Sequence, residues 1–194
     1  MFHMTSLSVS KRLYLLVASA VMGLAALLAL FLTSERSLIM EERQSGVRQT
    51  VQAAHGLITH FHGLAAKGTL SEADAKAQAL AAIRGLRYSE VEYFWINDMH
   101  PRMVMHPIRP ELEGKDLSEN KDPEGTFLFK EFVAMVKKSG AGFVPYMWPK
   151  PGSENPVQKV SYVQGFAPWG WVIGSGVYVD TVTATIWDRT LKMG

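Results

Sequence analysis

Hydrophobic residues in this chain first form an unbroken run and then recur at a helical spacing. Residues 13–32 (LYLLVASAVMGLAALLALFL) carry no charged side chain over twenty positions. A helix of that length spans about 30 Å, which is the thickness of the hydrocarbon core of a bilayer. The run therefore predicts one transmembrane helix at 13–32.

The next stretch predicts two further helices. Residues 34–66 contain no proline, and their apolar side chains recur three and four positions apart. This spacing is typical of a long amphipathic helix, here continuous with the membrane segment. A second helix is predicted at 71–84, because the Ser71 hydroxyl is placed to cap the amide of Asp74.

Beyond residue 85 the pattern changes to short runs rich in β-branched and aromatic residues, with turns between them. Such runs predict strands, and short turns favour antiparallel pairing. The predicted strands are 91–97, 102–106, 142–148, 157–166 and 171–179. A helix at 126–138, with Thr126 as its N-cap, precedes the third strand, and a closing helix is predicted at 180–192.

The order of these elements indicates an α+β fold. An antiparallel sheet and a long amphipathic helix each need an apolar partner, and each can cover the other. We therefore expect a PAS-like antiparallel five-stranded sheet packed against the long N-terminal helix and preceded by one transmembrane helix. The predicted segments are an N-terminus at 1–12, the membrane helix at 13–32, two helices at 33–84, the sheet core at 85–180 and a membrane-proximal helix at 181–194.

The charges around the membrane segment predict its orientation. Lys11 and Arg12 precede the segment, and all eighteen acidic residues follow it. The positive-inside rule then places residues 1–12 in the cytoplasm and 33–194 outside, which in a bacterium is the periplasm. Small residues at 18–20 look like a signal-peptide cleavage site but lie too early in the apolar run. We therefore expect a retained anchor in the inner membrane.

Composition and motifs exclude several classes of function. The chain has no cysteine, which excludes disulfides, thiol nucleophiles and Cys-ligated zinc. Its basic residues form no stretch or stripe, so we expect no nucleic-acid partner. Gly174-Ser175-Gly176 does not match the nucleophile-elbow pattern, and the histidines lack carboxylates at ligand spacing. We expect no enzyme, no metal site and no cofactor; a membrane-tethered hydrolase is the disfavoured alternative.

Aromatic residues gather in the predicted strands, where charges are few. Tyrosine and tryptophan suit small-molecule pockets because each combines an apolar body with a polar tip. Lys159 lies midway along its strand, and Arg87 lies just before the first strand. A cation among aromatic neighbours favours an anionic ligand, and a small carboxylate is the simplest candidate.

Strand alternation limits which side chains can line a pocket, and Arg87 and His106 can reach in from the strand ends. The predicted set is Arg87, Tyr93, Trp95, Met105, His106, Tyr146, Trp148, Lys159, Ser161 and Tyr162. Lys159 is expected to neutralise the ligand carboxylate, with Arg87 as the alternative anchor. Tyr162 has the opposite parity to Lys159 and Ser161 and joins them only where the strand bulges. The expected apolar walls are Trp95, Met105 and Trp148.

Eight short segments, in order between residues 85 and 180, carry a resemblance to a known family. They are YFWIND (93–98), MHP (105–107), GKDL (114–117), DPEG (122–125), GFVPYMW (142–148), KPG (150–152), KVSYV (159–163) and WVIGSGVYV (171–179). This ordered set resembles the extracytoplasmic single-Cache (Cache_2-type) sensor domain of bacterial methyl-accepting chemotaxis receptors. The resemblance implies a PAS-like sheet with a pocket for short carboxylates such as acetate, propionate, pyruvate or lactate.

The resemblance also raises expectations about the rest of the protein. Such receptors continue through a second membrane helix into a cytoplasmic signalling domain, whereas this sequence stops at Gly194. We expect either a truncated receptor or a single-anchored Cache protein, with the downstream signalling domain missing from this chain. Sensor histidine kinases and diguanylate cyclases use similar input domains, so the output class stays open.

Two predictions concern assembly and signalling. The length of the helix at 34–66 predicts a parallel homodimer through that helix, because it exceeds what one sheet face covers. Tryptophan and basic residues favour the membrane interface. The closing helix, with Trp187, Arg189 and Lys192, is therefore predicted to lie near the membrane and to carry the signal.

Overall fold

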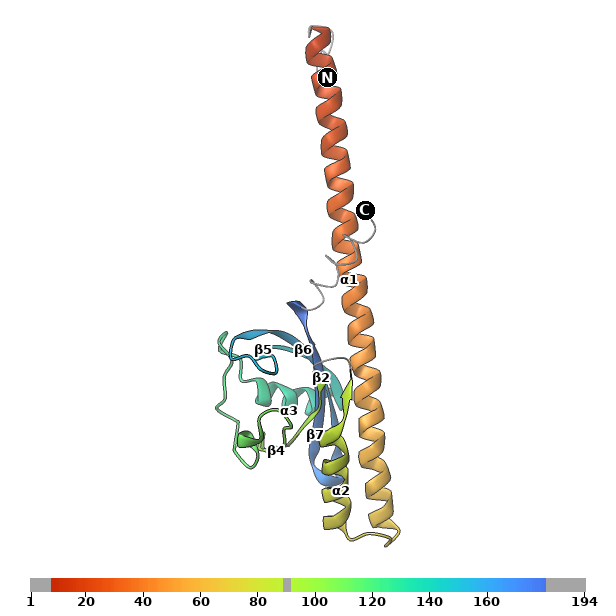
Figure 1. Ribbon diagram of the computed structural model, residues 1–194, viewed down its shortest axis with the longest axis vertical. Helices are drawn as coiled ribbons and strands as arrows, with labels where there is room; N and C mark the ends of the chain where they lie inside the picture. Colours follow the sequence, from red (N-terminus) through yellow and green to blue (C-terminus); the bar gives the residue numbers. More distant parts are fainter. Residues whose placement is uncertain (1–7, 89–91, 181–194) are drawn as a thin grey trace. The chain divides into compact units, whose positions relative to one another are not determined.

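The computed structural model describes residues 8–88 and 92–180 (Figure 1). The chain divides into two compact units, Met1–Ile39 and Met40–Gly194. Helix α1 (Val9–Ala66) contains residues of both units. The prediction that the apolar run and the amphipathic stretch after it form one continuous helix is therefore confirmed.

The first unit contains the apolar run. Val9–Phe31 has 23 residues and a mean hydropathy of 2.4, which makes it long and apolar enough to cross a membrane. This segment overlaps the transmembrane helix predicted at 13–32. Its orientation in a membrane stays a prediction.

In the second unit, helix α2 (Glu72–Gly85) begins as predicted. The Ser71 hydroxyl accepts a hydrogen bond from the Asp74 N–H at 3.0 Å and so satisfies one of the free amides of the first turn. The buried side of α2 is formed by Ala75, Ala79 and Ile83.

Helix α3 (Leu128–Ser139) corrects the prediction of its N-cap. Phe127 occupies the cap position and makes no side-chain hydrogen bond there, so Thr126 is not the N-cap. The Thr126 N–H instead donates to Asp122 Oδ1 at 2.8 Å, which holds Thr126 in the preceding turn. At the other end Gly140 adopts a φ of 75°, a left-handed value that ends the helix.

The five-stranded antiparallel sheet is confirmed. Its strand order is β4-β3-β7-β6-β5. The strands are β3 (Trp95–Asp98), β4 (Met103–Met105), β5 (Ala141–Pro149), β6 (Pro156–Phe166) and β7 (Trp171–Tyr178). The pairs β5–β6 and β6–β7 keep a continuous register over their whole length.

The strand predicted at 91–97 is divided in the structure. β2 (Glu92–Tyr93) pairs with β1 (Arg87–Tyr88) in a separate two-stranded ribbon, and β3 begins only at Trp95. The Tyr93 carbonyl accepts a hydrogen bond from the Ser175 hydroxyl of β7. This bond lies where the chain passes from the two-stranded ribbon into the five-stranded sheet.

The sheet has two unlike faces, which we call the α1 face and the α3 face. The α1 face packs against α1 and α2 in a cluster that includes Val47, Val51, Ala54, Ile58, Ala79, Ile83, Ile96, Tyr162, Phe166, Ile173 and Val177. The α3 face packs against α3 in a second cluster that includes Trp95, Leu128, Phe129, Phe132, Val144, Tyr146, Trp148, Val163 and Val172. The predicted closing helix at 180–192 lies, from residue 181 on, outside the described residues.

Candidate functional site

A small cavity lies on the α3 face. Its walls come from β2, β3, β5, α3 and the residue after β4. The lining residues are Tyr93, Trp95, His106, Leu128, Phe129, Phe132, Tyr146 and Trp148. The cavity measures about 10 Å³, close to the least that one water molecule needs. Any organic ligand therefore enters by displacing side chains of this mainly aromatic wall.

Lys159 supplies a buried positive charge beside the cavity. Its side chain is 0% exposed. The Lys159 Nζ atom lies 4.3 Å from the ring centroid of Tyr93, 5.6 Å from that of Trp95 and 4.6 Å from that of Tyr178. The Tyr178 hydroxyl, at 3.4 Å, is a hydrogen-bond partner. Aromatic faces attract an ammonium but do not replace the hydrogen bonds that it makes in water.

No carboxylate of the described chain lies within ion-pair distance of Lys159. Glu92 in β2 interacts with it electrostatically from farther away. This carboxyl is buried, and its Oε2 atom has no hydrogen-bond partner. Burial raises the pKa of Glu92 more than the charges of Lys159, Arg43 and Lys150 lower it. A carboxyl whose charged form is disfavoured is a poor counter-ion, so the ammonium still favours the approach of an anion.

The polar tips of the lining residues are oriented by hydrogen bonds. Trp148 Nε1 donates to the Tyr93 hydroxyl at 3.0 Å, and the Tyr146 hydroxyl lies 2.9 Å from Ser161 Oγ. Burial raises the pKa of Tyr146 well above its usual value, so this side chain stays a neutral phenol. Hydrogen bonds therefore fix the hydroxyl groups of two lining residues, Tyr93 and Tyr146.

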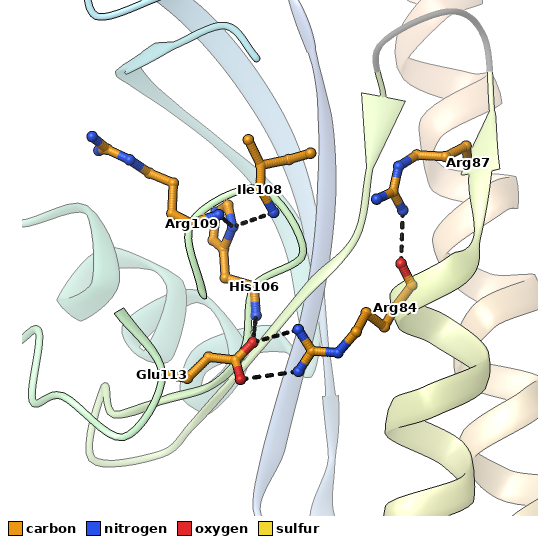
Figure 2. Close-up of polar contacts among 6 residues, drawn as sticks. All are labelled: Arg84, Arg87, His106, Ile108, Arg109 and Glu113. Carbon is orange, nitrogen blue, oxygen red and sulfur yellow. Dashed lines mark hydrogen bonds and ion pairs between the residues drawn. The ribbon is translucent and has the colours of Figure 1, made fainter. Parts of the chain in front are cut away.

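His106 adds a neutral donor. Its side chain is 2% exposed, and burial together with the charges of Lys159 and Arg109 lowers its pKa to about 3. Figure 2 shows that His106 Nδ1 accepts hydrogen bonds from the N–H groups of Ile108 and Arg109, at 3.3 and 3.0 Å. A neutral imidazole whose Nδ1 is an acceptor carries its proton on Nε2. The ring thus keeps an Nε2–H donor at the wall of the cavity.

Seven of the ten predicted site residues come together here. Tyr93, Trp95, His106, Tyr146 and Trp148 line the cavity, and Lys159 and Ser161 contact lining residues. The structure leaves Arg87, Met105 and Tyr162 apart from this group.

Arg87 and Met105 lie elsewhere for different reasons. Arg87 is exposed in β1, where its guanidinium donates to the backbone carbonyls of Arg84 and Leu86 at 2.8 and 2.7 Å. Met105 belongs to the α1 face. A bulge between β3 and β4 pairs Met105 with Ile96, so Met105 follows Ile96 onto that face.

Tyr162 also belongs to the α1 face, because β6 pairs with both neighbours without a bulge. Its ring lies 5.0 Å from that of Phe143. The missing parts of the wall come instead from α3, which contributes Leu128, Phe129 and Phe132. The sequence predicts a helix at 126–138, but that prediction does not show which face of the sheet the helix covers.

The glycines of β7 allow close approach on the α3 face. A Cβ atom at Gly174 would overlap the Trp95 ring, and one at Gly176 would overlap Ser161 Oγ. Ser175 between them points to the opposite face, where its hydroxyl lies 2.7 Å from that of Tyr88. The Gly-Ser-Gly segment therefore shapes the packing, and Ser175 contacts no histidine or carboxylate in the described chain.

Comparison with known sequences identifies relatives over nearly the whole chain. The family model dCache_2, a Cache domain, matches residues 16–193. The methyl-accepting chemotaxis protein McpP of Pseudomonas putida is 48% identical over 179 residues, which are 92% of this chain and 33% of McpP. The chain therefore spans about a third of the length of this curated relative.

Two solved structures share the fold. One, "Periplasmic sensor domain of chemotaxis protein", has a TM-score of 0.71 and 56% identity and covers 72% of this chain and 97% of its own. The other, "Structural basis for carboxylic acid recognition by a Cache chemosensory domain", has a TM-score of 0.71 and 52% identity and covers 74% and 97%. Almost all of each solved chain therefore has a counterpart here.

Proposed function

Because the chain belongs to the Cache domain family, we propose that it is the periplasmic ligand-sensing domain of a bacterial chemotaxis receptor, anchored in the inner membrane by its N-terminal helix. One observation carries the proposal. Lys159 is a fully buried ammonium beside an aromatic cavity, and the described residues provide no carboxylate to pair with it. Leaving a charge buried without a partner is costly, so the buried ammonium favours an incoming anion.

The ligand that fits is a small carboxylate of the acetate, propionate, pyruvate or lactate class. Lys159 neutralises the charge, and the Nε2–H of His106 and the hydroxyls of Tyr93 and Tyr146 are donors for its oxygens. The aromatic wall contacts the short carbon chain, and the small cavity favours a ligand of few atoms. The 52% identical structure concerned with carboxylic acid recognition supports this class.

The test is a calorimetric titration of propionate into the full chain in detergent micelles. Lys159→Met keeps the length of the side chain but removes its charge, and loss of one partner of a buried charge pair costs about 2–5 kcal/mol. We expect its affinity to fall by at least about 30-fold. Lys130→Met is the matched control, because Lys130 is an exposed lysine of α3 that forms an ion pair with Glu119.

Circular dichroism shows whether each variant keeps the fold. The proposal holds if Lys130→Met binds as the wild type does while folded Lys159→Met does not. Equal affinity of all three proteins would show that Lys159 is structural. Proton spectra of propionate after long incubation with the chain separate sensing from catalysis: we expect the ligand to be recovered unchanged.

Dimerisation of the receptor is also part of the proposal. We expect residues 34–66 of α1 to form a parallel homodimer. Two sensing domains would then act together on one pair of membrane helices. Analytical ultracentrifugation of the full chain in density-matched detergent tests this point. A monomer at high concentration, with and without propionate, would contradict it.

A further inference from the structure

An ion pair at the end of α2 is joined directly to the backbone of His106. Glu113 follows the short 3-10 helix η2 (Pro110–Leu112), and its Oε1 atom accepts a hydrogen bond from the His106 N–H at 2.8 Å. Arg84, in the last turn of α2, binds the same carboxylate through Nη1 to Oε1 at 2.8 Å and through Nη2 to Oε2 at 2.9 Å. Figure 2 shows the Glu113 carboxylate joined to both of the other residues.

The same segment also holds the imidazole ring. His106 Nδ1 accepts from the N–H groups of Ile108 and Arg109, so residues 106–113 fold back on the ring. The ring is thereby fixed from its own turn, and its backbone is fixed from Glu113. A shift of Glu113 would move the backbone on which the cavity-lining imidazole stands.

This ion pair is better suited to positioning than to stability. The side chains of Arg84 and Glu113 are 42% and 27% exposed, and exposed ion pairs contribute little to folding. Its geometry is nevertheless specific, because a guanidinium binds a carboxylate through two parallel contacts. Hydrogen bonding to Arg84 holds the pKa of Glu113 below its usual value, so the carboxylate keeps its charge at neutral pH.

The pair connects the two faces of the sheet. On one side it meets His106, which lines the cavity of the α3 face. On the other side Arg84 belongs to α2, and Ala79 and Ile83 of this helix pack in the same cluster as Ile58 of α1. A movement of His106 at the cavity can therefore reach α2 through Glu113 and Arg84.

We infer that Arg84 and Glu113 are positioning residues for the ligand: their ion pair holds His106 at the cavity and ties the occupied cavity to α2. This inference rests on the proposed function, since it concerns how the same site gains its affinity. Neither residue needs to contact the ligand, because both act through the backbone of His106.

Calorimetry with propionate and the full chain in detergent micelles gives the first readout. We expect Glu113→Ala to weaken binding about tenfold, because it removes both the acceptor for His106 and the partner of Arg84. Glu113→Gln keeps an acceptor for the His106 N–H and should restore part of the loss. Glu119→Ala is the matched control, since Glu119 is an exposed glutamate paired with Lys130.

The second readout is the titration of His106 without ligand. Selective labelling of the six histidines, with His106→Gln to assign the signal, reports the protonation of this ring by NMR. In the wild type burial holds the pKa of His106 at about 3. If Glu113→Ala releases the ring from its buried position, the pKa should rise toward the ordinary value of 6.5. The charge of Glu113 itself raises the pKa of His106, so its removal without release of the ring would lower this pKa further; only a rise reports that the ring has left its buried position.

The two readouts distinguish a failure of this inference from a failure of the proposed function. If the wild type binds propionate and Glu113→Ala matches it in affinity without a rise in the His106 pKa, the inference is overturned. If the wild type binds no short carboxylate, the proposed function fails, and the ligand-free titration still decides whether Glu113 positions His106. Should Glu113→Ala fail to fold, Arg84→Ala decides: a weaker affinity with a raised His106 pKa supports the inference, and wild-type values of both overturn it.

Discussion

The two faces of the sheet share the same strands but differ in what they bury. The α1 face is mainly aliphatic and is closed by α1 and α2. The α3 face buries aromatic rings with polar tips, the ammonium of Lys159 and the imidazole of His106. Strand β6 serves both, since it directs Tyr162 to one face and Lys159 to the other.

This difference shows how one sheet divides stability from recognition. Burial of apolar side chains, as on the α1 face, is the dominant favourable contribution to folding. A buried charge on the α3 face is unfavourable until an anion pairs with it. Substitutions on the α1 face should therefore change the free energy of unfolding, and substitutions on the α3 face should mainly change ligand affinity.

The largest expected effect is a loss of stability on the α1 face. Ile58 of α1 is fully buried in the cluster of that face, and replacing a buried isoleucine by alanine costs about 2–5 kcal/mol. Denaturant unfolding of Ile58→Ala in detergent measures this loss. Calorimetry below the melting temperature should give a propionate affinity close to that of the wild type. A large loss of affinity in the folded variant would mean that the two faces are not separable.

A smaller effect is expected where an added methyl group enters the α3 face. Gly174→Ala would push against the Trp95 ring, and overpacking of this kind costs about 1–3 kcal/mol. Since Trp95 lines the cavity, we expect propionate affinity to fall as well. Gly56→Ala is the control: this glycine of α1 has open space around its Cβ position, and the change should stabilise the helix by about 0.5–1 kcal/mol. If Gly174→Ala bound propionate as tightly as the wild type, the packing of Trp95 against Gly174 would not determine affinity.

The smallest effect concerns pH. Burial lowers the pKa of His106 to about 3 in the folded chain, against an ordinary 6.5. Between these values the unfolded chain binds a proton that the folded chain does not. The contribution of this ring is therefore complete above pH 6.5 and is lost as the pH falls toward 3, by at most about 1.4 kcal/mol per pH unit.

The His106→Gln variant isolates this contribution. Its unfolding free energy should fall less than that of the wild type when the pH is lowered from 7 to 5. The expected difference between the two proteins is about 1–2 kcal/mol. If the two proteins lost stability equally as the pH falls, the pH dependence of the wild type would come from a group other than His106.

Much of the fold was predictable because its signals are local. The apolar run, the spacing in α1 and α2, and the Ser71 cap follow from neighbouring residues alone. The division of 91–97 into β2 and β3 was not, because the two strands pair with different partners and β3's partner β7 is far along the chain. The misplaced cap at Thr126 has a different cause, since Asp122 holds its amide in a turn.

The candidate site was predictable where strand parity applies. Parity grouped Lys159 with Ser161 and set Tyr162 apart, and the structure places them so. The prediction of Met105 as an apolar wall was wrong, because a bulge in β4 shifts its face without any mark in the pattern of apolar residues. Contacts between distant segments, such as the pairing of Arg84 with Glu113, leave no local signal at all.

A crystal structure of the full chain with propionate tests the central claim most directly. The account predicts the ligand on the α3 face, with its carboxylate about 3 Å from Lys159 Nζ and from His106 Nε2 and its methyl group against the aromatic wall. Propionate bound away from Lys159, for example in the cavity lined by Met99, Val136 and Phe166, would contradict it.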